Sequence, residues 1–420
     1  MGWDFELGGE IMKKTMILII IILCALLFAE IETIKRDRAI LREGPASYYP
    51  IKSELQKGTE FFIKQELAGW LEVELNDTDG FLSKKVITAR KEKTDLFGQM
   101  NFDGASLKLS KHGMSAGVKG FAENFSKKFS GDPTFLGRMY SYEFDYKAYK
   151  KFRKATYKRF NIKKNRKKIH LPDYSGNDFF NMSEEGIGIG IASRIASFGI
   201  YENPAVNTYV NFVGNIVAES TDVYDIQFRF FILNSEKVNA YACPGGIIFI
   251  TKGLLKQIQT EAELATVLAH EMAHVARKHG MKEMEQRKHH INADDVFAEM
   301  DAEFAEFGVE TEEDKSIEEE LDELAFDIYE TIVSGRLKQY EDDADYLGIL
   351  YAARAGYDSK QLINLLNRLQ YFKKGSTNEH YNQDDIQKRI DKIKMLKLPK
   401  FPKNLFDKKQ RCEESLYYVD

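Results

Sequence analysis

The sequence predicts a multi-domain protein in which a small all-β barrel precedes a mainly helical α+β domain. Three observations lead to this fold class. Residues 30–90 contain short alternating segments separated by turn residues, which is typical of β-strands. Residues 183–400 show mostly helical spacing of apolar side chains, with two short strand-like runs between the helices. The length of 420 residues is enough for two or three domains with ordinary hydrophobic cores.

Residues 1–29 are predicted to be a signal peptide or an N-terminal anchor. Lys13 and Lys14 precede fourteen uncharged residues at 16–29, a run shorter than the roughly twenty residues of a transmembrane helix. A lipid anchor at Cys24 is a further option. We therefore expect an exported protein of the periplasm or cell envelope that meets a membrane only through this segment. The net charge of −5 gives no global field toward nucleic acid, and no nucleic-acid partner is expected.

The barrel prediction for residues 30–90 rests on alternation at 60–64 and 70–75, with turn residues at 57–59 and 76–77. This stretch resembles the bacterial SH3-like domain. The resemblance is carried by LREGP at 41–45, LxKGT at 55–59, GWLxV at 69–73 and GFL at 80–82. It implies a module that binds a cell-wall or envelope ligand. Trp70 is interpreted as a core or rim aromatic, with a ligand platform as the alternative.

The motif H-E-x-x-H is formed by His270, Glu271 and His274. Thr260 and Glu263 make a capping box upstream, and good helix formers follow, so the motif is predicted to be helical. Positions four apart share one helix face, which lets both imidazoles bind a single ion while Glu271 reaches a water on it. This is the arrangement of zinc hydrolases. The apolar residues around the motif disfavour the alternative, a solvated helix face.

A zinc site needs a third protein ligand, and the helical pattern at 340–358 offers candidates. Glu341 could supply that ligand. Asp345, one turn later, could accept a hydrogen bond from a ligand histidine and thereby define its tautomer. From spacing alone the assignment stays open, because acidic residues are abundant nearby.

H-E-x-x-H, the later E-x-x-A-D at 341–345 and the earlier N-A-x-A-x-P-G-G at 239–246 together resemble the HtpX-like gluzincin metallopeptidases. This family includes the CAAX prenyl proteases and periplasmic quality-control proteases. The similarity runs from about residue 183 to about residue 396. It implies a zincin-type domain with one Zn²⁺ per chain on His270, His274 and Glu341. It further implies Glu271 as the general base and Asp345 as the residue behind a ligand.

Two further parts of the site follow from the same resemblance. Family members often carry S-T-H-P-x-x-x-x-R, whose His and Arg are thought to steady the oxyanion. The nearest match here is STNEH at 376–380 with a later Arg; the Pro is missing and the spacing is longer. The roles would fall to His380 and Arg389. Zincins also hold the peptide along an edge strand, and the candidate strand is formed by Gly246, Ile247, Ile248 and Phe249. A wholly internal strand is the alternative.

Two segments have one-sided charge. Residues 91–182 are predicted to be a basic, partly helical linker region, with twelve Lys or Arg and no acid within 147–168. An exposed helical face is the default interpretation, and a surface for an anionic partner is the alternative. Residues 282–335 are an acidic insertion, with seventeen Asp or Glu and one Lys between 294 and 330. A solvated helical hairpin is the default; a lid held by the basic segment is the sharper hypothesis.

These patterns predict a zinc endopeptidase, with residues 183–400 as its peptidase domain and 401–420 as a C-terminal tail. The resemblance implies protein or peptide substrates, chiefly unfolded or misassembled proteins of the cell envelope. Two alternatives remain. One is a non-proteolytic chaperone or binding factor that keeps the metal structurally. The other is a wall-peptide hydrolase guided by the SH3-like module.

Overall fold

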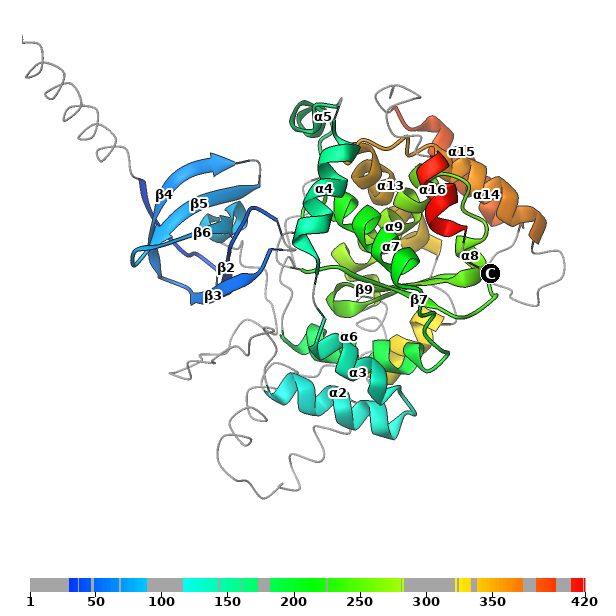
Figure 1. Cartoon of the computed structure of the whole chain (residues 1–420), viewed down its shortest axis with the longest axis horizontal. Helices are drawn as coiled ribbons and strands as arrows, with labels where there is room; N and C mark the ends of the chain where they lie inside the picture. Colours follow the sequence, from blue (N-terminus) through cyan, green and yellow to red (C-terminus); the bar gives the residue numbers. More distant parts are fainter. Residues whose placement is uncertain are drawn as a thin grey trace, which may run out of the picture. The chain divides into compact units, whose positions relative to one another are not determined.

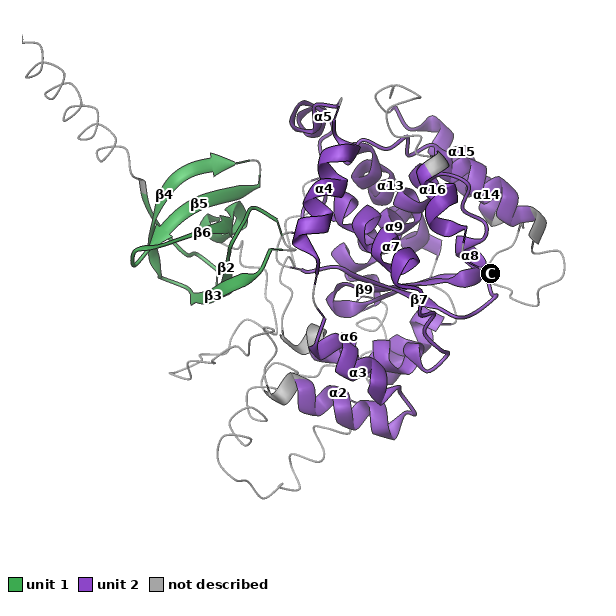
Figure 2. Cartoon of the chain, viewed as in Figure 1, with its two compact units in different colours: residues 1–90 green, residues 91–420 purple. Residues whose placement is uncertain are grey.

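The computed structural model divides the chain into two compact units, residues 1–90 and residues 91–420 (Figure 2). The structure describes residues 30–36, 38–46, 49–67, 69–88, 116–142, 144–158, 160–172, 182–223, 226–280, 282, 322, 325–333, 338–372, 383–397, 409–417 and 419.

Unit 1 is an antiparallel sheet whose described residues form six strands and one short 3-10 helix. The strands are ordered β1-β4-β5-β6-β2-β3. The elements are β1 (Glu30–Thr33), β2 (Arg38–Arg42), β3 (Ile51–Gln56), β4 (Glu60–Leu67), β5 (Trp70–Leu75), β6 (Thr78–Ser83) and η1 (Lys84–Ile87). The prediction of an all-β first unit is therefore confirmed, while its likeness to SH3-like domains stays a prediction.

The strands of unit 1 close over a single apolar core. In β4, Phe61 and Ile63 are buried in that core, whereas Phe62 between them is exposed, as period-2 alternation requires. Asn76 and Asp77 both have positive φ, 45° and 60°, and join β5 to β6 as a two-residue hairpin turn. Trp70 is only 5% exposed. Its burial supports the core role over the ligand platform.

Unit 2 is mainly helical and contains a three-stranded sheet. Its helices are α2 (Ala116–Lys128), α3 (Pro133–Tyr140), α4 (Tyr146–Thr156), α5 (Ile162–Lys168), α6 (Met182–Ala196), α7 (Pro204–Ala218), α8 (Lys252–Leu255), α9 (Glu261–Ala276), α13 (Lys338–Arg354), α14 (Gln361–Phe372), α15 (Gln383–Met395) and α16 (Lys409–Leu416). The strands are β7 (Arg229–Leu233), β8 (Ala240–Cys243) and β9 (Ile247–Thr251), with the 3-10 turn η2 (Pro244–Gly246). The prediction of a mainly helical second domain is confirmed.

The sheet of unit 2 lies between two layers of helices. Helices α2, α3 and α6 cover one face, and α7, α9 and α13 lie on the other (Figure 1). The strand order is β7-β9-β8, with β9 parallel to β7 and antiparallel to β8. All five residues of β9 are buried, because helices cover both of its faces and strands flank both of its edges.

Residues 91–182 were expected to be a linker region, and for their described helices this prediction was wrong. Phe121 and Phe125 of α2 and Phe135 of α3 are fully buried, in one core with side chains of α6 and β9. The phenyl rings of Phe135 and Phe249 have centroids 5.5 Å apart. Aromatic side chains of this size are too costly to leave in water, so these helices belong to unit 2.

The acidic insertion is described at residue 322 and at the helical residues 325–333. These residues are not a solvated hairpin, because Ala325 and Ile328 are fully buried in the core of α2 and α6. Asp322 is buried as well and pairs with Lys128 of α2 at 2.7 Å. The remainder of the insertion lies outside the described residues, and the hypothesis of a lid stays untested.

The N-terminal prediction also falls outside the described part of the chain, since residues 1–29 are not described. In the part that is described, no helix has both the length and the apolar character needed to cross a membrane.

Candidate metal centre

Helix α9 brings the H-E-x-x-H motif into the interior of unit 2. Its N-cap, Thr260, accepts a hydrogen bond from the amide of Glu263 at 3.1 Å. The Glu263 carboxylate in turn accepts from the amide of Gln259 at 2.7 Å, so the predicted cap is present with its return bond shifted by one residue. Every residue from Glu261 to Val275 is buried. The motif therefore lies on a buried helix, as its apolar surroundings predicted.

His270, His274 and Glu341 converge on one point. The Nε2 atoms of His270 and His274 are 3.1 Å apart. The two carboxylate oxygens of Glu341 each lie 3.4 Å from one of these nitrogens. Ligand atoms about 2.0–2.1 Å from a tetrahedral zinc ion would be about 3.3 Å from one another. The three side chains thus match the base of a zinc coordination tetrahedron, and they form a candidate metal-binding group among the described residues.

The convergence depends on a close approach of α13 to α9. Gly348 of α13 lies directly against the backbone of His270. A Cβ at Gly348 would be 2.8 Å from both the Cα and the N of His270, closer than real Cβ contacts. Only a glycine lets α13 come near enough for Glu341 to reach the two imidazoles. Gly348 was not among the predicted site residues, although a glycine inside a helical pattern is the signal for such a contact.

Asp345 lies behind His270, on the side away from Glu341 and His274. The Nδ1 of His270 lies 3.0 Å from the Asp345 carboxylate, although the angle at this contact is poorer than in an aligned hydrogen bond. Arg389 of α15 donates two bonds to the same carboxylate, at 2.7 and 2.8 Å. Its third nitrogen lies 3.3 Å from Glu341. Arg389 therefore contacts the site, but through the two carboxylates; its predicted role at an oxyanion stays a prediction.

His274 is held by a different set of contacts, which was not predicted from the sequence. Its Nδ1 lies 2.9 Å from Nδ1 of His279, and Nε2 of His279 lies 3.2 Å from the carboxylate of Asp343. His279 is 1% exposed and stacks on the ring of Tyr340, with centroids 4.6 Å apart. Arg277 lies 3.4 Å from the same Asp343 carboxylate.

With both imidazoles neutral, one proton arrangement satisfies this chain. A carboxylate can only accept, so His279 donates from Nε2 to Asp343 and presents a bare Nδ1. That nitrogen must then accept from Nδ1 of His274. The Nε2 of His274 is left without a proton, which is the tautomer that a metal ligand requires. The signal for His279 in the sequence is a histidine five residues after the motif, just past the end of α9.

The charges of the cluster suit a divalent cation. Glu271, Glu341, Asp343 and Asp345 bring four carboxylates, whereas Arg277 and Arg389 bring two guanidinium groups. Burial lowers the pKa of His270, but the adjacent carboxylates Asp345 and Glu341 outweigh burial and raise it to about 10. Burial raises the pKa of Glu341, but its two histidine neighbours outweigh burial and hold it well below its usual range. The excess negative charge favours a bound cation.

Glu271 is 9% exposed and follows His270 on the same buried helix. Burial raises the pKa of Tyr241 of β8, and nearby groups that include Tyr329 and Glu271 raise it further. Strand β8 therefore borders the carboxylate predicted to be the base.

Asn239, just before β8, makes two hydrogen bonds with the hydroxyl of Thr251. Its amide donates to that hydroxyl at 3.0 Å, and its carbonyl accepts from the same hydroxyl at 2.8 Å.

The predicted substrate strand was wrong. Ile247, Ile248 and Phe249 belong to β9, which is the central strand, with β7 on one edge and β8 on the other. A peptide cannot add to a strand whose two edges are already paired. Gly246 lies in the turn before it, with φ of 82°. His380 lies outside the described residues, and its role stays a prediction.

Comparisons with known proteins agree with this geometry. Residues 204–397 match the family model described as Peptidase family M48. The beta-barrel assembly-enhancing protease of Yersinia pestis is 32% identical over 93 residues, 22% of this chain and 19% of that protein. The Escherichia coli protein of the same name is 29% identical over 89 residues, 21% of this chain and 18% of that protein. The mitochondrial metalloendopeptidase OMA1 of Arabidopsis thaliana is 27% identical over 152 residues, 36% of this chain and 28% of that protein.

The chain spans less than a third of the length of each of these relatives. The matched region nevertheless contains the whole cluster, from His270 on α9 to Arg389 on α15. Residues 204–397 are therefore similar to a metallopeptidase family, and the matched range contains the three motifs.

Proposed function

We propose that this protein is a zinc endopeptidase that hydrolyses peptide bonds in proteins of the cell envelope. The observation that carries the proposal is the triangle of His270, His274 and Glu341, with ligand atoms 3.1 to 3.4 Å apart. These are the imidazole and carboxylate donors that zinc takes in catalytic sites with three protein ligands and one open position.

A zinc ion held there would polarise the scissile carbonyl and lower the pKa of the attacking water. Glu271 would accept a proton from the attacking water and deliver it to the nitrogen of the leaving amine. Asp345 and His279 keep the two ligand imidazoles in the orientation and tautomer described above. Arg389 holds Asp345 and Glu341 in place, so that the carboxylates do not move as charge develops.

The peptide substrate would lie along β8 instead of β9. Among the described residues β8 pairs with one strand only, and it packs against α9 beside Glu271. Main-chain pairing with a strand tolerates many side-chain sequences. This tolerance fits a substrate class of unfolded or misassembled proteins. The names of the bacterial relatives, which concern the assembly of β-barrel proteins, support an envelope substrate for this chain.

The test is degradation of an unfolded protein such as casein by the zinc-loaded chain and by Glu271→Gln. Glu271→Gln keeps the three ligands and loses the base, so turnover should fall by about a hundred- to ten-thousandfold while zinc content stays the same. Glu123→Gln, which changes an exposed carboxylate of α2, should match the wild type. Equal cleavage by wild type and Glu271→Gln would contradict the mechanism. A wild type that binds zinc but cleaves no protein would favour a structural metal in a chaperone.

A further inference from the structure

The lysines of α4 and α5 form a one-sided basic surface. Along α4 and the turn after it, exposed lysines recur at spacings of three and four, which places them on one side of the helix. Exposed lysines of α5 continue the surface. We call this surface the lysine face; it consists of Lys147, Lys150, Lys151, Lys154, Lys158, Lys163, Lys164, Lys167 and Lys168.

The opposite side of the same two helices packs against the rest of unit 2. Arg153 of α4 and Arg166 of α5 both pair with the buried carboxylate of Glu219, at 2.8 and 3.3 Å. Asn165 donates to the carbonyl of Ala353 in α13 at 2.8 Å. These two arginines are thus neutralised by Glu219, and the helices that carry the lysine face are held to the rest of unit 2.

The lysine face is electrostatically unfavourable for the protein by itself. Lysines four residues apart, such as Lys147 with Lys151 and Lys163 with Lys167, repel each other on a helix. Residues 146–172 contain no Asp or Glu. Among the described residues, no carboxylate pairs with Lys151, and the same holds for Lys147, Lys154, Lys158, Lys163, Lys164, Lys167 and Lys168. The whole chain is net negative, at −5, so this concentration of positive charge is local.

We propose that the lysine face docks unit 2 on an anionic phospholipid membrane. A row of lysines beside a membrane attracts anionic headgroups, and this attraction weakens as salt is added. The face has the composition of a headgroup surface and lacks that of a single-strand nucleic-acid surface, because none of the exposed large apolar side chains of the described residues lies on α4 or α5. An N-terminal anchor, one of the two roles predicted for residues 1–29, would bring the chain to a membrane.

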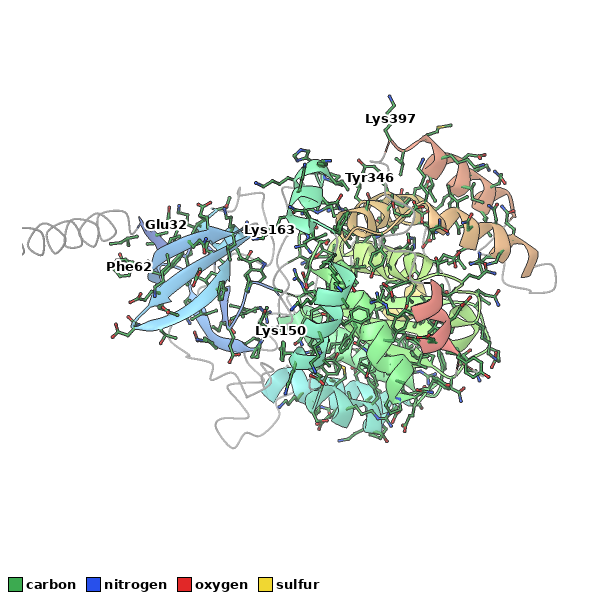
Figure 3. The ribbon with its side chains drawn as sticks, turned by 45° about the horizontal axis from the view of Figure 1, so that its top comes forward. Glu32, Phe62, Lys150, Lys163, Tyr346 and Lys397 are labelled. Atoms are coloured by element: carbon green, nitrogen blue, oxygen red, sulfur yellow. The ribbon has the colours of Figure 1, made fainter. Side chains whose placement is uncertain are left out.

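This docking leaves the metal centre accessible. Helix α5 contacts the end of α13 at Ala353, whereas Glu341 lies near the other end, about 18 Å away along the helix axis. Figures 1 and 3 show α4 and α5 on the same side of unit 2, with Lys150 and Lys163 projecting from them. The membrane would therefore lie at the Ala353 end of α13, away from Glu341.

The experiment measures co-sedimentation of the full chain with phosphatidylcholine vesicles that contain rising fractions of phosphatidylglycerol. The test variant replaces Lys147, Lys151, Lys154 and Lys158 by Gln. The matched control removes the same number of charges elsewhere, by replacing Lys127, Lys237, Lys360 and Lys397 with Gln. All of these lysines are exposed, so both variants should fold, which thermal unfolding verifies.

Wild type and control should bind more tightly as the anionic fraction rises and release as salt is added. The test variant should lose at least about tenfold of the binding to anionic vesicles, and Lys→Arg at the same four positions should restore it. Casein cleavage by the test variant should equal that of the wild type, which separates this proposal from the proposed function. Unchanged vesicle binding by the test variant, an equal loss by the control, or tighter binding to duplex DNA than to anionic vesicles would overturn the proposal.

Discussion

Helix α9 carries a buried charged cluster at each end, and the two clusters are balanced in different ways. At its first residue, Glu261 is fully buried. Its carboxylate accepts from the hydroxyls of Tyr209 at 3.1 Å and Tyr357 at 3.0 Å, and from Arg411 of α16 at 2.6 Å. A second nitrogen of Arg411 bonds the other oxygen. Every lone pair that burial removes from water thus receives a donor from the chain.

At the other end of α9 the carboxylates outnumber the guanidinium groups, four to two. The Nε2 atoms of His270 and His274 lie 3.1 Å apart, and each lies 3.4 Å from an oxygen of Glu341. We therefore expect two helical positions with similar burial to serve different purposes. The Glu261 cluster should stabilise the fold by itself, whereas the His270 cluster should bind an external cation. The predictions below separate the two by measuring stability and zinc affinity in the same variants.

Arg411→Ala should cause the largest loss of stability. The variant leaves the Glu261 carboxylate buried without its cation, which costs about 3 kcal/mol in the free energy of unfolding. Zinc affinity of the folded variant should stay within about threefold of the wild type, since no metal ligand contacts Arg411. Chemical denaturation and a zinc competition titration measure the two quantities, with Glu414→Ala on the exposed side of α16 as the control. A large loss of zinc affinity with unchanged stability would reverse the assignment of the two clusters.

Glu341→Gln should show the opposite pattern. An amide oxygen is a poor zinc ligand, so affinity should fall by at least about a hundredfold. The apo protein should lose less stability than Arg411→Ala does, because Asp345 still pairs with His270 and an amide leaves no buried carboxylate without a partner. Asp342→Asn is the matched control: it changes the next residue of α13, whose carboxylate pairs with Lys392 at 2.5 Å and is not a ligand. Competition titration with a zinc chelator measures the zinc affinity of both variants. Equal affinities of Glu341→Gln and Asp342→Asn would contradict the assignment of Glu341 as a ligand.

His279→Ala tests how His274 is held. Loss of the His274–His279–Asp343 chain frees the ring to rotate and to place its proton on Nε2, so zinc affinity should fall about ten- to hundredfold. Replacement of the exposed His170 by Ala should have no effect. In the wild type, nitrogen-detected NMR of the zinc-loaded protein should report the proton of His274 on Nδ1. A proton on Nε2 would rule out the arrangement deduced here.

Gly348→Ala should have the smallest effect, and it should lower both the stability and the zinc affinity. The added methyl group pushes α13 away from His270, which costs about 1–3 kcal/mol of stability and draws Glu341 from its ligand position. Gly137→Ala on α3 is the comparison, because nothing lies within 4 Å of its Cβ position. That variant should be neutral or slightly stabilising, by up to about 1 kcal/mol. If both glycines tolerate alanine equally, close helix packing is not what positions Glu341.

The parts of the molecule that depend on local geometry could be predicted from the sequence. The cap at Thr260, the helix that follows it and the shared face of His270 and His274 are all properties of a single helix. The hairpin turn at 76–77 likewise depends on two residues that tolerate positive φ. These predictions were confirmed because no distant segment is needed to form them.

The parts that depend on which segments meet could not be predicted in the same way. Strand β9 is a run of apolar residues, and nothing within it distinguishes a central strand from an edge strand. His279 gains its role only when α13 brings Asp343 beside it. Helices α2 and α3 looked like part of a linker because their aromatic partners lie on α6 and β9, far along the chain. Glu341 was reached through family resemblance, not through spacing.

The central claim is that α9 and α13 together hold one zinc ion. X-ray absorption at the zinc edge, with metal content determined on the same sample, tests it most directly. The prediction is one zinc per chain, bound by two imidazole nitrogens and by oxygen ligands from Glu341 and water, with no sulfur. In Glu341→Gln the zinc spectrum should lose the contribution of the carboxylate ligand, and zinc should bind more weakly. A sulfur ligand, a single imidazole or a zinc spectrum unchanged in Glu341→Gln would contradict the account.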